Sequence, residues 1–515
     1  MLSPLRNPIA CALLSGLLLI LSFPQAHLTL LAWVALAPLL ATISYHRSRP
    51  RLLLAGYLTG SVFFAGSCYW IYDVMRIYGH LSVVAASGVL LLFVLSFALF
   101  FGMFSLLVGE LARRWQLLAL AAAPFAWVAV EWLRTYVVFG GFPWNLLGYA
   151  IAPHVGWIQH AAYAGVYGVS FLVAAVNALV AAYWLVPTHR RALLLGAVAV
   201  ALTVAEIWVW QLPPVPTTAQ ASLVQPNLPQ QEEFDPEWVR HHPEELVRLE
   251  QMTRGAVRHN PEEMPTLVIW PEVPVSFYFH HDPTLRARLL QLAQATRSYF
   301  LVGIVDYRPD TEGVQQPYNS AVLLSPSGEF VAQYDKIHLV PFGEYLPLER
   351  WLGFLGPLVQ EVSAFRPGSQ PAVLPAEEGK LGVLICYEAI FPGLVRQFVE
   401  RGATVLVNIS NDGWYGRSAA PAQHLNMARL RAVETRRFLL RATNTGVTAV
   451  VDPFGRLTVQ APTHTAAVLT AGFAYRSDQS FYVRNGDWFA ALCALVMLAA
   501  LARKLWITAV EATED

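Results

Sequence analysis

The sequence predicts a polytopic α-helical membrane bundle of about eight spans, joined to an extracytoplasmic α/β domain. Hydrophobic residues make up 55% of the 515 residues and charged residues only 14%, whereas charged residues form about 25% of an ordinary soluble protein. The apolar excess lies in residues 2–211 and 488–506, and the region between them has the composition of a globular domain. In that middle region, β-rich runs alternate with segments of helical periodicity.

These boundaries divide the chain into three parts. Residues 1–211 are expected to form an N-terminal bundle of about seven helices, 212–486 the α/β domain, and 487–515 a last helix with a cytoplasmic tail. The proline-rich stretch at 212–219 is interpreted as the linker between bundle and domain.

Eight apolar runs approach the length of about 20 residues that a helix needs to cross a bilayer. They lie near residues 8–23, 28–45, 52–72, 82–110, 117–135, 159–186, 191–210 and 487–507. The first follows Arg6 and has no small-residue cleavage site behind it, so we interpret it as a retained helix and not a signal peptide.

Positive charges indicate how these runs are oriented, because Lys and Arg concentrate in cytoplasmic loops. Five basic positions fall on alternate connections between the runs: Arg6, His46–Arg51, Ala112–Trp115, His189–Arg191 and Arg503–Lys504. If all five lie in the cytoplasm, residues 212–486 and the loop 136–158 lie on the opposite side of the membrane.

The middle region is expected to form a layered domain of alternating strands and helices. The strand-like runs are 221–225, 266–270, 299–305, 320–325, 330–334, 381–386, 404–410 and 446–451. Helical periodicity fits 284–297, 393–401 and 422–441, and the Pro and Gly of Ser325–Phe330 indicate a hairpin turn.

Charge and cysteine usage exclude several classes of function. The formal net charge is zero, so the chain lacks the basic signature of a nucleic-acid partner. Of four cysteines, Cys11, Cys68 and Cys493 lie in apolar runs and Cys386 is alone in the middle domain, which leaves no disulfide framework there. Cys and His do not cluster at zinc-like spacing, and no metal or organic cofactor is expected.

Three residues able to do chemistry stand at the ends of strand-like runs. "LVIWPE" ends in Glu272, Lys336 follows "FVAQY", and "LGVLIC" ends in Cys386. Ligand sites of α/β sheets collect at strand ends. A carboxylate there can take the proton of a thiol, and an ammonium group can lower the thiol pKa and stabilise an anionic intermediate of acyl transfer. The residues alone leave two interpretations open, a buried core thiol or a nucleophile.

The motifs "WPE", "YDKIHLVPFGEY" and "LICYE", in this order, resemble the nitrilase (carbon–nitrogen hydrolase) superfamily over about 220–470. The resemblance implies a four-layer α-β-β-α sandwich. It also implies a triad in which Glu272 is the general base, Cys386 the nucleophile and Lys336 the stabiliser of the oxyanion.

Three further residues have supporting roles in this reading. The backbone N–H of Tyr387 is expected to share the oxyanion with the lysine. Glu344 is expected to orient the lysine or to share proton transfer, and Glu388 to hold the nucleophile loop. Structural hydrogen bonding alone is the alternative for both glutamates.

Over nearly its whole length the chain resembles the apolipoprotein N-acyltransferase family. The matching motifs are "GFPWN" (Gly141–Asn145), "VQPNLPQ" (Val224–Gln230), and "NISNDGWYG" (Asn408–Gly416) followed by "QHLNMARLRAVE" (Gln423–Glu434). The resemblance implies a monomeric, multi-pass enzyme of the bacterial inner membrane whose catalytic domain faces the periplasm. Such an enzyme transfers an acyl group from a membrane phospholipid, through a thioester on Cys386, to the α-amine of the diacylglyceryl-cysteine of an apolipoprotein.

Six aromatic residues are expected to contact lipid: Trp144, Phe234, Trp351, Phe354, Trp414 and Tyr415. Some family members have Trp where this chain has Phe234, which lacks the indole N–H donor. The run Trp351–Val359 is expected to be a lid that dips into the bilayer surface, or else a buried helix. The "WYG" of residues 414–416 is expected to line an acyl tunnel or to pack beneath the site.

Two functions of other classes compete with this one. A membrane-tethered nitrilase or amidase that hydrolyses a small amide would use the same triad, and the spans and "GFPWN" favour a lipid substrate over it. A transporter or scaffold with an inactive domain is disfavoured because Glu272, Lys336 and Cys386 are all present.

Overall fold

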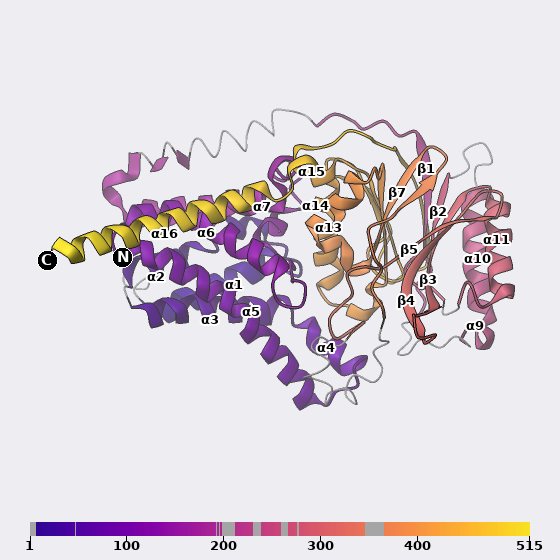
Figure 1. The fold of residues 1–515 in the computed structure, drawn as a ribbon, viewed down its shortest axis with the longest axis horizontal. Helices are drawn as coiled ribbons and strands as arrows, with labels where there is room; N and C mark the ends of the chain where they lie inside the picture. The colour runs from indigo at the N-terminus through magenta and orange to yellow at the C-terminus, as the bar shows by residue number, and fades with distance from the viewer. Residues whose placement is uncertain are drawn as a thin grey trace.

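The structure is a computed structural model that describes residues 7–46, 48–191, 193–194, 196–197, 212–229, 238–258, 266–275, 278–345 and 365–514. A helical bundle forms one end of the molecule and a two-sheet domain forms the other (Figure 1). The described N-terminus and the C-terminus both lie at the end of the bundle that is farthest from the sheets (Figure 1).

The bundle is built from the N-terminal segments and the C-terminal helix. Its elements are α1 (Pro8–Ser22), η2 (Thr29–Trp33), α2 (Ala37–Tyr45), α3 (Arg49–Ser67), α4 (Trp70–Ile77), α5 (Val83–Ala112), α6 (Gln116–Tyr136), η3 (Leu147–Ile151), α7 (Ala161–Leu185), η4 (Pro187–His189), α15 (Phe481–Asn485) and α16 (Trp488–Glu514). The yellow α16 runs along α6 and α7 and returns the chain end to the N-terminal side (Figure 1).

The expected number of spans is met in part. Within the described residues, α5, α6, α7 and α16 are long and apolar enough to cross a membrane, and α3 with α4 adds a fifth span if this pair, bent by 52°, counts as one. Pro8–Ser22 and Thr29–Tyr45 form shorter apolar helices. The expected span at 191–210 lies largely outside the described residues.

The second expected run is broken because a new helix begins inside it. Pro38 stands in the first turn of α2, where its missing N–H costs nothing and its ring favours helix initiation. The expected run at 28–45 is apolar throughout, yet it forms two short helices, η2 and α2.

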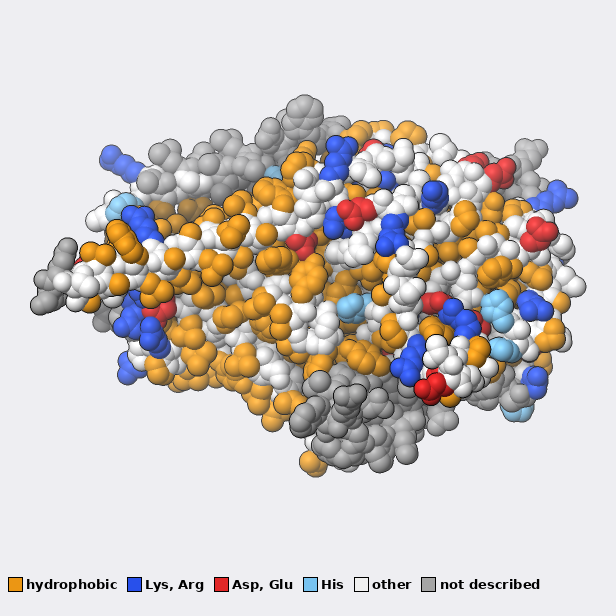
Figure 2. All heavy atoms as spheres, in the orientation of Figure 1, with side chains coloured by type: hydrophobic (Ala, Val, Ile, Leu, Met, Phe, Trp, Pro, Cys, Tyr) orange, Lys and Arg blue, Asp and Glu red, His pale blue; other side chains and the backbone are white. Residues whose placement is uncertain are grey.

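The surface of the bundle suits a lipid environment. Hydrophobic side chains cover the bundle on the face shown in Figure 2, whereas charged side chains gather at its far end and on the two-sheet domain. Val84 is 82% exposed and Leu92 is 69% exposed, both on α5. Apolar exposure on this scale marks a membrane or interaction surface, and it lies on a helix that is long and apolar enough to cross a membrane.

Within its described residues, the domain contains two six-stranded sheets. The first has the order β12-β1-β2-β3-β4-β5 and the second β11-β10-β9-β8-β7-β6. The strands are β1 (Ala219–Gln225), β2 (Leu267–Ile269), β3 (Tyr299–Pro309), β4 (Gln315–Leu324), β5 (Phe330–Asp335), β6 (Val373–Ala376), β7 (Gly379–Ile385), β8 (Val405–Ser410), β9 (Leu439–Thr443), β10 (Ala449–Val451), β11 (Leu457–Gln460) and β12 (Ala467–Phe473). The centre of each sheet is parallel, β1-β2-β3 in the first and β7-β8-β9 in the second.

Side-chain alternation along the strands explains the layering. Leu267 and Ile269 point into the core between the two sheets, whereas Val268 and Trp270 join a second core beneath the outer helices. Those helices are α9 (Trp238–His241), α10 (Pro243–Arg258) and α11 (Pro283–Thr296), and α13 (Pro392–Glu400) and α14 (Ala420–Thr435) cover the other sheet (Figure 1). The expected α-β-β-α sandwich is confirmed.

Helix α14 joins the two halves of the molecule. Ala428 and Ala432 belong to the same hydrophobic cluster as the strands of the second sheet, whereas Met427 and Val433 belong to the core of the bundle. The expected helix at 422–441 is wrong at its end, because α14 stops at Thr435 and β9 begins four residues later.

Candidate active site

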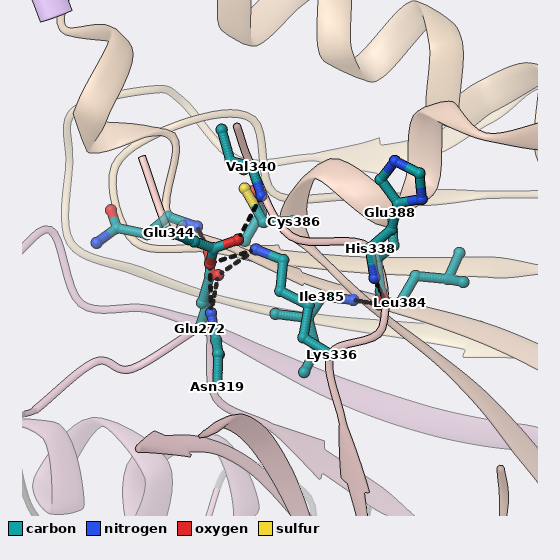
Figure 3. Close-up of polar contacts among 12 residues, drawn as sticks. Glu272, Asn319, Lys336, His338, Val340, Glu344, Leu384, Ile385, Cys386 and Glu388 are labelled. Carbon is teal, nitrogen blue, oxygen red and sulfur yellow. Dashed lines mark hydrogen bonds and ion pairs between the residues drawn. The ribbon is translucent and has the colours of Figure 1, made fainter. Parts of the chain in front are cut away.

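The predicted catalytic residues come from the ends of three strands in two sheets. Glu272 lies three residues beyond β2, Lys336 follows β5, and Cys386 follows β7 as the first residue of η6 (Cys386–Ile390). All three side chains are nearly fully buried. Figure 3 shows the three side chains pointing toward one another. The sulfur of Cys386 points toward the Lys336 ammonium group and the carboxylate of Glu344.

Lys336 lies between two carboxylates. Its Nζ is 2.7 Å from Glu344 Oε1 and 3.3 Å from Glu272 Oε1. Burial opposes the charge, but Glu344 and Glu272 outweigh burial and raise the pKa of Lys336. An ammonium group has three N–H donors, so one remains for a substrate oxygen after the two carboxylates are satisfied.

Neutral donors fix the positions of both carboxylates. The side-chain Nδ2 of Asn319 donates to Glu272 Oε1 at 2.8 Å and to Glu344 Oε1 at 3.0 Å. The backbone N–H of Asn411 donates to the other oxygen of Glu272, and that of Val340 to the other oxygen of Glu344. These bonds hold the site in one geometry before any substrate binds.

The surroundings of Cys386 favour the protonated thiol over the thiolate. Burial raises the pKa of Cys386, and Glu272 raises it further, while Lys336 acts in the opposite direction. A buried thiol of this kind needs a base at the moment of attack.

The backbone at Cys386 is in a left-handed conformation. Its φ is +50°, which costs a non-glycine residue about 1–2 kcal/mol. The turn carries the chain from the end of β7 into η6, and such strain persists only where surrounding contacts hold it.

Glu388 links the lysine segment to the cysteine strand. Its Oε1 accepts hydrogen bonds from Tyr334 Oη and the N–H groups of Ile337 and His338, and its Oε2 accepts one from the N–H of Ile385. Burial raises the pKa of Glu388 to about 7, against the lowering effect of these donors. From this position the side chain can hold the nucleophile loop in place, which is the role expected from the sequence.

A second polar network lies behind Cys386. It joins Asn408 of β8, Asp412 of η7 (Asp412–Tyr415), His424 of α14 and Arg441 of β9, all of them buried. Sequence reasoning missed these residues and Asn319 as parts of the site. "NISNDGWYG" contains Asn408 and Asp412 and "QHLNMARLRAVE" contains His424, but only as family motifs without a role, and Arg441 fell inside the helix expected at 422–441.

Trp144 lies at the joint between bundle and domain and has no exposed surface. Its indole N–H donates to Gln423 Oε1 at 2.7 Å, and Gln423 Nε2 donates to the carbonyls of Pro24 and Ser67. The structure therefore gives Trp144 a contact that positions α14 and leaves none of its surface open to substrate.

The other predicted lipid contacts divide into two groups. Trp414 is 36% exposed and its ring packs on Tyr78, while Tyr415 packs on Trp70. Phe234, Trp351 and Phe354 lie outside the described residues.

The described part of the chain contains no cluster of three or more His, Cys, Asp or Glu side chains suited to a metal ion. What the arrangement offers is a buried thiol, a carboxylate to take its proton, and an ammonium group whose third N–H has no partner among the described residues. This set can carry acyl transfer.

Comparison with known families matches both halves of the chain. The carbon-nitrogen hydrolase family matches residues 220–476, and the N-terminal domain of apolipoprotein N-acyltransferase matches residues 15–179.

Three curated relatives named apolipoprotein N-acyltransferase align over nearly the full chain. The protein of Geobacter metallireducens is 38% identical over 511 residues, covering 96% of this chain and 95% of the relative. That of Methylococcus capsulatus is 36% identical with the same coverage, and that of Chlorobaculum tepidum is 31% identical and covers 97% of this chain and 98% of the relative.

Solved structures align with about half of the chain. An amidase from Nesterenkonia sp. is 21% identical over 53% of this chain and 95% of its own, with a TM-score of 0.38. Nit3 of Saccharomyces cerevisiae, a member of the nitrilase superfamily, is 20% identical over 50% of this chain and 91% of its own, with a TM-score of 0.39.

Proposed function

Because the chain belongs to the apolipoprotein N-acyltransferase family, we propose that it moves a fatty acyl group from a membrane phospholipid to the N-terminal α-amine of a diacylglyceryl apolipoprotein. The chain is an acyltransferase that acts on lipoproteins. The observation that supports the proposed chemistry is the buried Glu272–Lys336–Glu344 cluster beside Cys386.

In the first half-reaction, Glu272 takes the proton of the Cys386 thiol as the sulfur attacks the ester carbonyl of the phospholipid. The new C–S bond turns the carbonyl oxygen into an oxyanion. The free N–H of Lys336 and the backbone N–H of Tyr387 stabilise that charge. The C–O bond then breaks, and the lysophospholipid oxygen leaves with the proton that Glu272 holds.

In the second half-reaction, the lipoprotein amine attacks the thioester carbonyl. Glu272 takes a proton from the attacking nitrogen as the C–N bond forms, and the same donors stabilise the second oxyanion. The C–S bond breaks and the proton returns to the Cys386 sulfur. The thioester becomes an amide, and the enzyme is restored without a cofactor.

Membrane placement follows from the substrates in this proposal. Donor and acceptor are both anchored in lipid, so a site carried by a bundle with an apolar surface meets them without extracting either one. We assign the chain to the bacterial inner membrane as a monomer, with the two-sheet domain in the periplasm.

The resting state in this proposal is a thioester on Cys386, because phospholipid is abundant and the acceptor is scarce. Incubation of the purified chain with phospholipid alone should add one acyl mass to Cys386, measured by mass spectrometry, and hydroxylamine should release it. A diacylated lipopeptide should then discharge the acyl group into an amide.

Glu272→Gln is the matched variant for this experiment, because glutamine keeps the shape of the side chain but does not accept the thiol proton. It should not accumulate the adduct. If wild-type protein acylates the peptide only when both substrates are present, and no thioester is trapped beforehand, direct transfer in a ternary complex replaces the two-step scheme.

Sidedness is tested with a protease that does not cross the inner membrane. Added to spheroplasts, it should cleave loops within 212–486 and leave the basic loop at 46–51 intact, because basic loops stay in the cytoplasm. Cleavage at 46–51 with protection of the two-sheet domain would reverse the assigned orientation.

A further inference from the structure

The network behind Cys386 ends on the backbone of the nucleophile. His424 Nε2 lies 3.1 Å from the carbonyl oxygen of Cys386. His424 Nδ1 lies 3.1 Å from Arg441 Nη2 and 3.2 Å from Asp412 Oδ1, and the same Nη2 lies within 2.9 Å of both oxygens of Asp412. None of these three side chains has a part in the two half-reactions described above.

The contacts of the imidazole select its tautomer. With the proton on Nε2, His424 donates to the Cys386 carbonyl and accepts from Arg441, and only the contact with Asp412 Oδ1 is unfavourable. With the proton on Nδ1, two contacts are unfavourable, because Nε2 faces the carbonyl oxygen and the N–H faces that of Arg441. Burial and Arg441 lower the pKa of His424, which favours the neutral ring.

The carbonyl of Cys386 and the N–H of Tyr387 belong to one planar peptide group. A donor that holds the carbonyl therefore fixes the direction of the N–H on the opposite side of the plane. It also polarises the peptide and strengthens that N–H as a donor. We propose that His424 is a positioning residue that aligns the Tyr387 N–H with the oxyanion of both half-reactions.

The left-handed conformation of Cys386 explains why a hydrogen bond is needed to fix the orientation of the Cys386–Tyr387 peptide. A residue with φ of +50° is held by its surroundings and not by its own preference. Asn408 Nδ2 donates to the carbonyl of Leu384 at 2.9 Å and lies 3.5 Å from that of Cys386. His424 makes the shorter of the two contacts to the Cys386 carbonyl.

The residue before His424 connects the same helix to the bundle. Gln423 binds the indole of Trp144 and the carbonyls of Pro24 and Ser67. Two consecutive residues of α14 therefore face different partners. Gln423 contacts three segments of the bundle, and His424 contacts the backbone of the nucleophile. Through the hydrogen bonds of Gln423, the bundle holds this part of α14 where His424 meets the Cys386–Tyr387 peptide.

The test compares two reactions of Cys386 that differ in one respect. Acylation by a soluble p-nitrophenyl ester forms an oxyanion, whereas alkylation by iodoacetamide is a direct displacement that forms none. The inference rests on the proposed function only in that Cys386 is the residue acylated. If wild-type protein is acylated at Cys386 by the ester but never transfers an acyl group to a lipopeptide, the proposed function fails and this inference stands.

His424→Gln and His424→Asn form the matched pair. A glutamine amide reaches the position of Nε2 and can donate to the Cys386 carbonyl, whereas an asparagine amide reaches only the position of Nδ1. Loss of an oxyanion donor typically costs about 100- to 1,000-fold in rate, and misalignment costs less. We expect His424→Asn to slow acylation about 10- to 100-fold with alkylation changed less than about threefold, and His424→Gln to stay within about threefold in both.

Met427→Ala controls for loss of packing, because Met427 is buried on the bundle side of the same helix. It should lower the unfolding temperature and leave the ratio of acylation to alkylation unchanged. Equal slowing of both reactions in His424→Asn would mean that the thiol itself is displaced and would overturn the inference. An acylation rate in His424→Asn equal to that of His424→Gln would overturn it as well.

Discussion

Cys386→Ala is expected to abolish acyl transfer and to leave the fold intact. The thiol is the only one in the two-sheet domain, since Cys11, Cys68 and Cys493 lie in helices of the bundle or at their ends. Removal of the nucleophile of a comparable acyl-transfer site costs about 10⁶-fold in kcat. Transfer of labelled acyl groups to a diacylated lipopeptide measures the loss, and thermal unfolding of the same preparation shows that the variant is folded.

Cys386→Ser separates shape from nucleophilicity at the same position. The hydroxyl occupies nearly the volume of the thiol, but its pKa is much higher and its oxygen is a weaker nucleophile for thioester-type exchange. We therefore expect little transfer and no hydroxylamine-labile adduct from this variant. Transfer by Cys386→Ala at near wild-type rates would show that the acyl group never passes through this residue.

The strands that carry the site were predictable, because each reads as a short apolar run that ends in a polar residue. In β2, for example, Leu267 and Ile269 face one hydrophobic core and Val268 faces the other. The family resemblance predicted that two such sheets stack between layers of helices. Strand β9 was not predictable. Arg436 ends α14 in a left-handed conformation, and no glycine or asparagine marks that stop in the sequence.

Bends inside the bundle could not be predicted from hydropathy. The chain stays apolar or weakly polar through Cys68 and Tyr69, yet α3 and α4 meet there at 52°. Contacts made far away in sequence account for the placement of α4, since Tyr78 at its end bonds the carbonyl of Gly413. Hydropathy records which residues are apolar and carries no information on such partners.

The same limit applies to the site. Glu272, Lys336 and Cys386 stood out because reactive side chains ended strand-like runs and matched known motifs. His424 matched a family motif without a role attached to it, and Arg441 lies inside a strand, where a polar residue has no distinctive sequence signal. The role proposed for His424 rests on the contact of its Nε2 with the Cys386 carbonyl. These residues lie 38 positions apart in the sequence, so only the fold reveals the contact.

Lys336→Met should lower acyl transfer by about 100- to 1,000-fold, the usual cost of one oxyanion donor. Methionine fills much of the same volume but has no N–H to give to the oxyanion. The change also leaves Glu272 and Glu344 buried together without their cation, and breaking a buried pair in this way typically costs about 3–5 kcal/mol. The kcat for ester acylation and the free energy of unfolding should therefore both fall. Lys336→Arg should rescue poorly, because the planar guanidinium is larger than the ammonium group it replaces.

The two losses are separated by adding Glu344→Gln to Lys336→Met. The double variant removes one negative charge together with the positive one, so the remaining cluster is a single carboxylate held by Asn319 and the N–H of Asn411. Stability should recover relative to Lys336→Met, whereas kcat should remain about 100-fold or more below that of Glu344→Gln alone, because the donor to the oxyanion is still missing. If the double variant instead regains the activity of Glu344→Gln, the lysine serves only to neutralise the two carboxylates, and the oxyanion is stabilised by the backbone of Tyr387 without it.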